Sequence, residues 1–307
     1  MYDVAIIGGG PGGCAAAVYA ARKLLKTVLI TDVFGGQSLV SFDIQNWIGT
    51  PNISGDELAK NLEKHVRAYA GDVVDIVKSD KVKKIATGDM CFHVETENGK
   101  SFEAKTVLIT AGGNRKKLEV PGAAEFDQKG LTYCASCDGP LFGDADVAVV
   151  GGGNAGFETA AQLLAYAKSV TLLHRGENYA ADPVTVEKVL ADPKMKGILN
   201  AEPTKVSGEK FVTGLTYKDR KTGEEHDLAV TGVFVEIGMM ASTSFAEKLV
   251  DMDQYKRVIV DPKNQRTSME GVWAAGDCTN GLYHQNNIAA GDAVKALEDI
   301  YVYLKTR

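Results

Sequence analysis

Cys134 and Cys137 form a C-x-x-C pair that an acid, Asp138, follows directly. A thiol pair of this kind can bind a metal, stabilise structure or carry out redox chemistry. It lies between two glycine-rich segments of the dinucleotide-binding type, residues 8–13 and 151–156. A thiol pair between two nucleotide sites predicts an electron path from one cofactor to another and on to a disulfide.

A metal site at this pair is disfavoured, because zinc sites need about four ligands, usually as two pairs. The sequence contains no second C-x-x-C and no H-x3-H, and its histidines are scattered. Cys14, Cys91 and Cys278 have no local partner and are expected to be structural.

Each glycine-rich segment has the flanking elements that a dinucleotide site requires. Apolar runs at 4–8 and 147–151 lead into the glycines, and Ala-rich helical stretches follow at 14–23 and 157–167. In G-x-G-x-x-G the first glycine turns tightly, the second lets the backbone approach a pyrophosphate, and the third lets helix and strand pack closely. The candidate nucleotide-binding residues of these turns are Gly8, Gly10, Gly13, Gly151, Gly153, Asn154, Ala155 and Gly156. A second apolar strand follows each helix, so the sequence predicts the βαβ unit twice.

The two candidate sites differ at the end of the second strand. Asp32 lies about 20 residues after the first glycine turn, where a carboxylate can accept ribose hydroxyls; a turn cap is the alternative. The second site has His174 and Arg175 at this point, with Glu177 shortly after. A lone arginine suits either a 2′-phosphate or the adenine face.

Two connections divide the chain, and its 307 residues suit two domains. Segments 114–122 and 238–245 are polar or interrupted by glycine and proline, which is typical of crossings between domains. We therefore expect an α/β protein with two Rossmann-like dinucleotide-binding domains, the second inserted into the first. Residues 1–115 and 246–307 form one expected domain, and residues 116–245 the other.

The composition excludes several classes of function. Hydrophobic residues make up 45% and charged residues 24%, and the formal net charge is −6. This indicates a globular protein and argues against a nucleic-acid surface, since no Lys/Arg-rich run occurs. No signal segment is recognised, and no apolar stretch approaches the roughly 18 residues of a membrane span. We expect a cytoplasmic protein with no nucleic-acid or membrane partner.

The order and spacing of these motifs resemble those of the low-molecular-weight thioredoxin reductases. They are also similar to the reductase half of the flavoprotein subunit of alkyl hydroperoxide reductase. The resemblance covers essentially the whole chain, through segments 8–13, 35–37, 46–49, 134–139, 151–156, 267–277 and 285–291. It implies FAD in the split domain, a nicotinamide nucleotide in the inserted domain with the C-x-x-C pair, and a homodimer.

The resemblance also implies roles for individual residues. Together with Asp32, which its distance from the first glycine turn indicates, FAD contacts are expected at Gly8, Gly10, Gly13, Gly36, Gln37, Asn46, Gly276, Asp277 and Gln285. Asp277 would accept a ribityl hydroxyl, and Gln285 would lie near the isoalloxazine ring. Cys137 is implied as the sulfur nearest the flavin and Cys134 as its partner. Asp138 would exchange the proton as the thiolate leaves, with a simple turn residue as the alternative.

The sequence departs from the family at the nicotinamide site. The family's phosphate motif is His-Arg-Arg with a further arginine four residues later, whereas this chain has His-Arg-Gly at 174–176 and then Ala180. A 2′-phosphate would lose charge-assisted contacts worth about 1.5–3 kcal/mol each. We therefore expect NADH to be favoured over NADPH. Further departures near the expected flavin, at His284, Asn286 and Asn287, have no assigned role.

The expected function is that of a flavin-dependent disulfide reductase. A reduced nicotinamide would pass hydride to FAD, and the Cys134–Cys137 dithiol would then reduce a thioredoxin-type protein by thiol–disulfide exchange. Rotation at the two crossings would let one dithiol serve both sides. Three alternatives stay open: the same reductase fed by ferredoxin or another flavoprotein, an FAD-dependent dithiol oxidase, and a non-catalytic nucleotide-binding sensor or electron carrier. The intact motif at 151–156 counts against the oxidase, and the C-x-x-C pair counts against the sensor.

Overall fold

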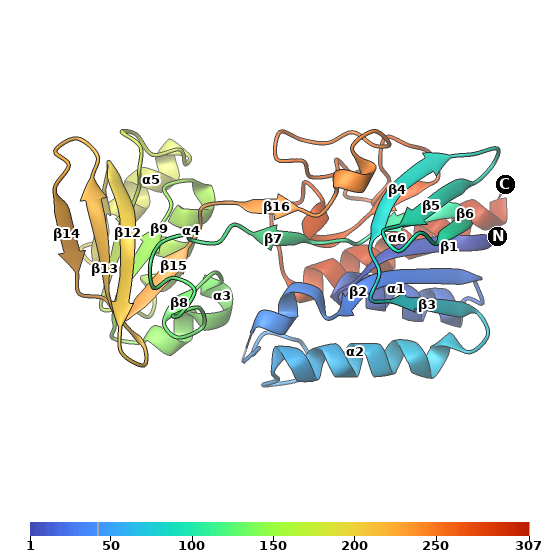
Figure 1. Cartoon of the computed structure of the whole chain (residues 1–307), viewed down its shortest axis with the longest axis horizontal. Coiled ribbons are helices and arrows are strands. Elements are labelled where there is room, and N and C mark those ends of the chain that lie inside the picture. The colour runs from blue at the N-terminus through green and yellow to red at the C-terminus, as the bar shows by residue number, and fades with distance from the viewer. Residues whose placement is uncertain (42, 307) are drawn as a thin grey trace. The chain divides into compact units, whose positions relative to one another are not determined.

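The computed structural model describes residues 1–41 and 43–306. The chain forms two compact units, one made of Met1–Asn114 together with Met240–Arg307 and the other of Arg115–Met239. The second unit is therefore inserted into the first along the chain. Each unit contains parallel strands with helices packed against them (Figure 1).

The first unit is built on a mixed sheet. Its strands are β1 (Tyr2–Gly9), β2 (Thr27–Phe34), β3 (Val74–Lys78), β4 (Val82–Thr87), β5 (Phe92–Thr96), β6 (Ser101–Ile109) and β17 (Val272–Ala274). Its helices are α1 (Pro11–Arg22), α2 (Gly55–Ala70) and α6 (Asn286–Thr306), with 3-10 turns η1 (Gly36–Val40), η3 (Ser244–Ala246) and η4 (Gly276–Cys278). The strand order is β3-β2-β1-β6-β5-β4, and β17 also pairs with β6. Strand β5 pairs in the antiparallel sense with both β4 and β6, and the other described pairs of this sheet are parallel.

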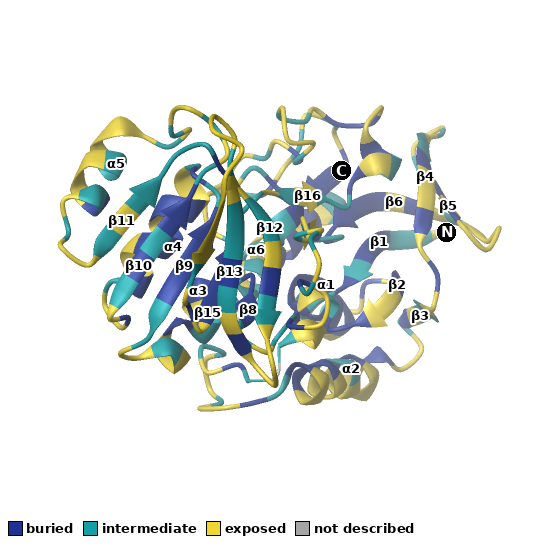
Figure 2. Cartoon of the chain, turned by 60° about the vertical axis from the view of Figure 1, so that its left-hand side comes forward, coloured by how far each residue is buried: buried dark blue, intermediate teal, exposed yellow. Residues whose placement is uncertain are grey.

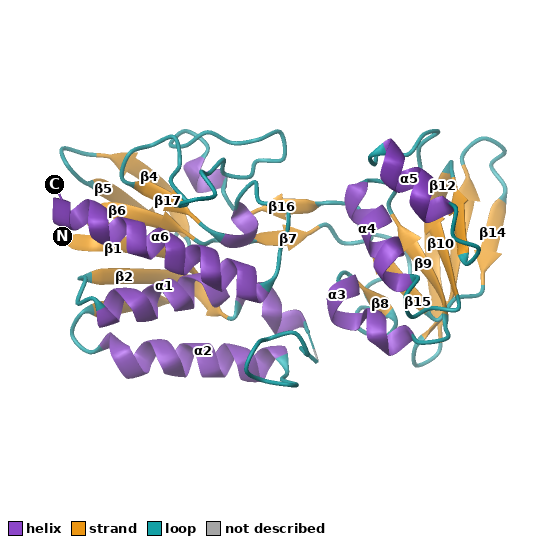
Figure 3. Ribbon diagram, turned by 180° about the vertical axis from the view of Figure 1, so that it is seen from behind, coloured by secondary structure: helices purple, strands orange, loops and turns teal. Residues whose placement is uncertain are grey.

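Strand β1 contributes to the core on both faces of this sheet. Successive side chains of a strand point to opposite faces, so Val4 and Ile6 lie on one face and Ala5 and Ile7 on the other. Val4 and Ile6 pack with residues of α1 and α6, which lie side by side against that face (Figure 3). Ala5 and Ile7 pack with residues of β4 and β5. Because both faces are covered, the strand is apolar without alternation.

The second unit combines a parallel sheet with an antiparallel one. The parallel strands are β8 (Leu131–Thr132), β9 (Asp146–Val150), β10 (Ser169–Leu173), β11 (Met195–Ile198) and β15 (Gly232–Val235), in the order β11-β10-β9-β15-β8. The antiparallel strands are β12 (Ala201–Gly208), β13 (Val212–Asp219) and β14 (Glu225–Leu228). The helices are α3 (Ala135–Asp138), α4 (Asn154–Leu163) and α5 (Pro183–Leu190), with the 3-10 turn η2 (Gly139–Phe142).

Strand β9 is buried between the helices and the antiparallel sheet. Val147 and Val149 pack with residues of α4 and α5, whereas Ala148 and Val150 pack with residues of β12 and β13. Figure 2 shows the buried residues of β9 and of its neighbour β10. The glycines directly after β9 therefore lie at the carboxyl edge of a buried sheet, where ligands of parallel α/β sheets bind.

Two short strands, β7 (Gly113–Arg115) and β16 (Met239–Ala241), connect the units and pair with each other. The second boundary lies at Met240, earlier than the expected residue 246. Gly112 and Gly238 flank these strands with φ angles of +64° and +118°, and a Cβ at either would meet nothing within 4 Å. Glycine is therefore needed there for backbone conformation rather than for packing. Among residues 1–41 and 43–306, the helices lack the combination of length and hydrophobicity that a membrane span requires.

Candidate active site

The first glycine turn joins β1 to α1 and requires glycine at two positions. Gly8 has a φ of +110°, which L side chains rarely adopt. A Cβ on Gly13 would lie 1.8 Å from the Gly8 carbonyl oxygen, so the helix approaches the strand only because residue 13 has no side chain. At Gly10 a Cβ would meet nothing within 4 Å. The N-terminus of α1 therefore begins beside open space.

The second glycine turn, between β9 and α4, repeats this geometry. Gly151 has a φ of +126°, a Cβ on Gly156 would lie 1.9 Å from the Gly151 carbonyl oxygen, and Gly153 borders open space. Asn154 Oδ1 accepts a hydrogen bond from the Asp182 N–H at 2.8 Å. Open cradles at two helix N-termini fit the pyrophosphates of two dinucleotides, because the backbone can approach a phosphate closely there.

Asp32 lies within β2, which continues to Phe34, so Asp32 does not end the strand as expected from the sequence. Its side chain is exposed, and its Oδ2 is 3.1 Å from Lys81 Nζ. Gly36 begins η1 with a φ of +55°, and its Cβ would lie 3.4 Å from the Gly10 Cα. The structure therefore brings Gly36 to the first glycine turn and gives Asp32 a lysine partner.

Amide side chains join the loop after β2 to the start of α6. Asn46 Nδ2 donates to Gln285 Oε1 at 3.1 Å, so two of the predicted flavin-site residues meet. Asn287 Nδ2 donates to the Asn46 carbonyl oxygen at 2.7 Å. Ser38 Oγ donates to Asn286 Oδ1 at 3.0 Å. Asn286 and Asn287, which had no assigned role, thus hold this loop against α6.

The remaining residues predicted to bind FAD lie beside β7 and just after β17. Gln37 Nε2 donates to Asn114 Oδ1 at 2.8 Å, which places Gln37 beside β7. Gly276, with a φ of +77°, and the half-buried Asp277 form η4 shortly after β17. Since β1 and β17 are both parallel to β6, Gly8 near the end of β1 and Gly276 just after β17 lie at the same edge of the sheet.

Cys134 and Cys137 form a disulfide in the second unit, with Cα atoms 5.3 Å apart. Cys134 is the N-cap of α3, Cys137 lies in its single turn, and both are partly exposed. Thr132 Oγ1 donates a hydrogen bond to Asp138 Oδ2, and the same Thr132 oxygen accepts one from the Cys134 N–H at 3.3 Å. Sequence motifs did not indicate Thr132. Its buried hydroxyl connects the acid to the first cysteine.

His174 and Arg175 follow β10 and lie at the second glycine turn. A Cβ on Gly152 would lie 2.5 Å from His174 Cγ, so the imidazole packs directly on the turn. Burial lowers the pKa of His174, and the Arg175 charge lowers this pKa further, so the ring is neutral near pH 7. Arg175 and Ala155 are exposed. The Ala180 N–H donates to the Gly152 carbonyl oxygen at 2.8 Å, which holds this segment against the glycines.

Glu236 is a second residue that motifs did not indicate. It follows β15, and a Cβ on Gly151 would lie 2.2 Å from its carbonyl oxygen. Its Oε1 accepts hydrogen bonds from Arg115 Nη1 at 3.0 Å and Thr159 Oγ1 at 3.1 Å. Burial raises the pKa of Glu236, although Arg115 and Thr159 act against this rise. One carboxyl group thus connects β7 and α4 beside the glycine turn.

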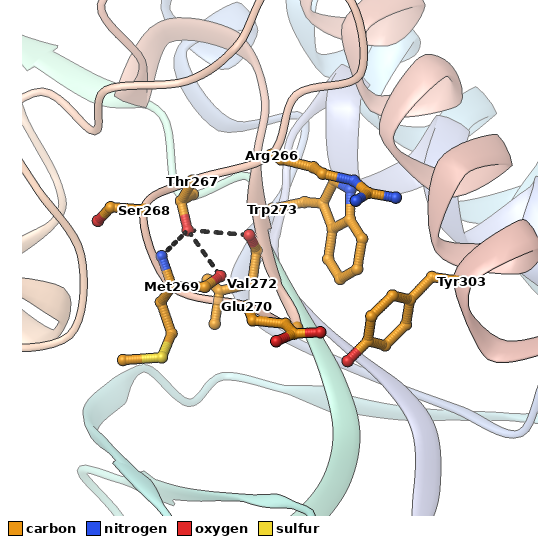
Figure 4. Close-up of a pocket in the computed structure, with 9 residues that line it drawn as sticks. Arg266, Thr267, Ser268, Met269, Glu270, Val272, Trp273 and Tyr303 are labelled. Carbon is orange, nitrogen blue, oxygen red and sulfur yellow. Dashed lines mark hydrogen bonds between the residues drawn. The ribbon is translucent and has the colours of Figure 1, made fainter. Parts of the chain in front are cut away.

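A pocket of about 290 Å³ lies beside β17, lined by residues 266–273 and Tyr303 (Figure 4). There Trp273 Nε1 donates to Asp299 Oδ2 at 2.8 Å, and Arg266 Nε donates to the same oxygen at 2.6 Å. The hydrogen-bonding groups of these side chains are paired with one another, so we regard the pocket as a feature of packing.

Within the described part of the chain, no cluster of His, Cys, Asp or Glu could hold a metal ion.

The chain is similar to known proteins over nearly its whole length. Residues 2–293 match the family model described as pyridine nucleotide-disulphide oxidoreductase. Over 303 residues the chain is 39% identical to the NADH dehydrogenase of Bacillus subtilis (strain 168). Over 304 residues it is 40% identical to an alkyl hydroperoxide reductase subunit of Escherichia coli (strain K12). These alignments cover 99% of this chain but 58% of either relative, so the chain spans little more than half of their length.

Solved structures are similar over the whole chain. The thioredoxin reductase of Streptococcus pyogenes MGAS5005 has a TM-score of 0.91 at 36% identity, covering 100% of this chain and 99% of that one. The thioredoxin reductase of Giardia duodenalis has a TM-score of 0.94 at 28% identity, covering 99% of both chains. The expected α/β fold with two dinucleotide-binding domains is confirmed.

Proposed function

The chain belongs to the pyridine nucleotide-disulphide oxidoreductase family, and on this premise we propose that it is a flavin-dependent reductase of protein disulfides. The Cys134–Cys137 disulfide carries the proposal, because it lies in the same unit as a glycine turn with an open cradle at Gly153. We propose FAD as the bound flavin, NADH as the favoured donor and a thioredoxin-type protein as the acceptor. We further propose that the protein acts as a cytoplasmic homodimer.

FAD is proposed to bind the first unit. The residues proposed to hold it are Gly8, Gly10, Gly13, Asp32, Gly36, Gln37, Asn46, Gly276, Asp277 and Gln285. The open space at Gly10 suits the pyrophosphate, and the bonded pair Asn46–Gln285 would lie near the ring system. When bound, FAD would supply the electron transfer that connects a hydride donor to a disulfide.

The nicotinamide nucleotide is proposed to bind at the second glycine turn. The residues proposed to hold it are Gly151, Gly153, Asn154, Ala155, Gly156, His174 and Arg175. NADH is favoured because the segment after β10 presents one arginine, a neutral His174 and the acidic Glu177. A dianionic 2′-phosphate would find few compensating charges on this segment.

The dithiol is proposed to act by exchange. In the reduced chain, the Cys134 thiolate attacks one sulfur of the partner disulfide, which forms a mixed disulfide and releases the other partner sulfur as a thiolate. The Cys137 thiolate then attacks Cys134 Sγ, which re-forms the Cys134–Cys137 bond and releases the second partner sulfur. Two electrons pass to the partner. Asp138, held by the Thr132 hydroxyl, is proposed to exchange protons with Cys137.

Cysteine variants test this function in the full chain under argon. We expect NADH to bleach the flavin absorbance of wild-type, Cys134→Ser and Cys137→Ser proteins, because the flavin is reduced before the disulfide. Only the wild type should then reduce thioredoxin. Cys91→Ser, which removes a thiol outside the site, is the matched control and should behave as the wild type.

Other results would identify another function. Retained thioredoxin reduction by Cys137→Ser would make the exchange mechanism wrong. Bleaching by reduced ferredoxin but not by NADH or NADPH would replace the proposed donor. Hydrogen peroxide formation from a small dithiol and oxygen, without any need for nicotinamide, would indicate a dithiol oxidase.

A further inference from the structure

The turn between β13 and β14 lies against the segment that follows β10, within the second unit. The Asn200 N–H donates to the Gly176 carbonyl oxygen at 3.0 Å, and the Arg220 N–H donates to the Asn200 carbonyl oxygen at 2.8 Å. Arg220 Nη1 also donates to the Arg175 carbonyl oxygen at 3.1 Å, across 45 residues of sequence. These bonds, two of them between backbone groups, hold residues 219–224 beside the end of β10.

Asp219 fixes the conformation of this turn. Its Oδ1 accepts hydrogen bonds from the N–H groups of Lys221 at 2.7 Å and Thr222 at 3.2 Å. These two bonds lower the pKa of Asp219, so the carboxylate is ionised near pH 7. The Lys221 side chain extends from this fixed backbone, and its Nζ lies 3.4 Å from Glu177 Oε1.

Glu177 follows the end of β10 by four residues, in the segment that would approach a bound nucleotide. A carboxylate just after the second strand of a dinucleotide-binding fold faces the adenosine ribose, where it accepts a hydroxyl of NADH and repels the 2′-phosphate of NADPH. The segment that contains Glu177 is held at the glycine turn by the hydrogen bond from Ala180 to Gly152. Lys221 counteracts the Glu177 charge, because a cation and an anion 3.4 Å apart exert a weak combined field on a third charge.

We propose, building on the nicotinamide nucleotide site proposed above, that the turn at residues 219–224 sets the coenzyme selectivity of this site. Lys221 reduces the repulsion between Glu177 and a 2′-phosphate, so the preference for NADH is modest in the wild type. Removal of Lys221 leaves Glu177 uncompensated and makes the site more selective for NADH. Removal of the Glu177 charge has the opposite effect.

The test measures dissociation constants of NAD⁺ and NADP⁺ by calorimetry on the full chain. The variants are Lys221→Met, Glu177→Gln and the control Lys168→Met. Lys168 is also exposed and ion-paired, with Nζ 3.1 Å from Asp146 Oδ2, but it lies near the amino-terminal end of β9, away from the glycine turn. Lys221→Met should raise the ratio of the NADP⁺ to the NAD⁺ dissociation constant about fivefold, as for one solvent-screened charge. Glu177→Gln should lower the ratio by a similar factor, and Lys168→Met should leave it unchanged.

High salt provides a second measurement, since the Debye length falls to about 3 Å at 1 M salt. The difference between the variants in the ratio of dissociation constants should therefore shrink.

An unchanged ratio of dissociation constants in both Lys221→Met and Glu177→Gln would overturn the inference, and so would an equal loss of affinity for both nucleotides. A wild type that binds neither nucleotide would also overturn it. A wild type that binds both nucleotides but reduces no protein disulfide would contradict the proposed function alone.

Discussion

Thr132 connects Asp138 to the first cysteine of the disulfide. It is 3% exposed, and its hydroxyl donates to Asp138 while it accepts from the Cys134 N–H. A hydroxyl can do both at once because it has one proton and two lone pairs. Thr132 therefore orients Asp138 relative to the cysteines, and we regard it as a positioning residue.

Replacing Thr132 with valine keeps the shape of the side chain and removes the hydroxyl. We expect Thr132→Val to slow exchange with a small disulfide roughly tenfold and to shift its pH profile, because Asp138, the proposed proton-transfer group, loses its hydrogen-bond donor. Thr132→Ser restores a hydroxyl and should recover most of the rate. Stopped-flow kinetics across a pH series would measure both effects. A Thr132→Val protein with the wild-type rate and pH profile would exclude the positioning role.

At the scale of elements, the two glycine turns are the same device used twice. In each turn, the last glycine allows the helix to approach the strand, and the middle glycine leaves open space at the helix N-terminus. The last glycine thus serves the packing of the fold, and the middle glycine is proposed to serve ligand binding. A substitution at each position can therefore separate the two.

Gly156→Ala and Gly153→Ala form a matched pair in the second turn. A Cβ at Gly156 would lie 1.9 Å from the Gly151 carbonyl oxygen, so strand and helix must separate, and we expect a loss of about 1–3 kcal/mol in unfolding free energy. At Gly153 the backbone has a φ of −93° and a Cβ meets no atom within 4 Å. Gly153→Ala should change stability by less than about 0.5 kcal/mol, yet weaken NAD⁺ binding by occupying the cradle. Urea unfolding and calorimetry measure the two effects, and a Gly156→Ala protein as stable as the wild type would contradict the packing role.

At the scale of the whole molecule, the two units have separate cores. Within the described residues, each apolar cluster belongs to one unit alone. The units are connected by β7 and β16, next to Gly112 and Gly238. We propose that these connections act as the hinge for a rotation that presents the dithiol to each partner in turn.

Separate cores predict that each ligand stabilises one unit. NAD⁺ at about 100 times its dissociation constant should stabilise the native second unit by about 2.7 kcal/mol. In a peptide-resolved measurement, NAD⁺ should therefore slow hydrogen exchange in Arg115–Met239 and leave it unchanged in the core strands of the first unit. FAD should slow hydrogen exchange in the first unit instead. Equal protection of both units by NAD⁺ would show that the units do not respond independently.

Much of the fold and of the candidate site could be predicted from short patterns, because the constraints behind them are local. Gly8 and Gly151 are glycines because their φ angles are positive, and the runs around β1 and β9 are apolar because both faces are covered. The C-x-x-C spacing alone allows the Cys134–Cys137 bond. Asp32 departed from its expected place because the end of a strand depends on pairing with its neighbours, here between Gly9 and Phe34.

The sequence by itself determined the fold class, the two glycine turns and the redox pair. The tertiary structure alone decided which distant groups meet: Asn46 with Gln285, and Lys221 with Glu177. Such meetings depend on strand register and on the path of turns between strands, and a short sequence pattern contains neither. For this reason the chemistry of the disulfide could be predicted from the sequence, while the pairing of Lys221 with Glu177 became apparent only in the folded second unit.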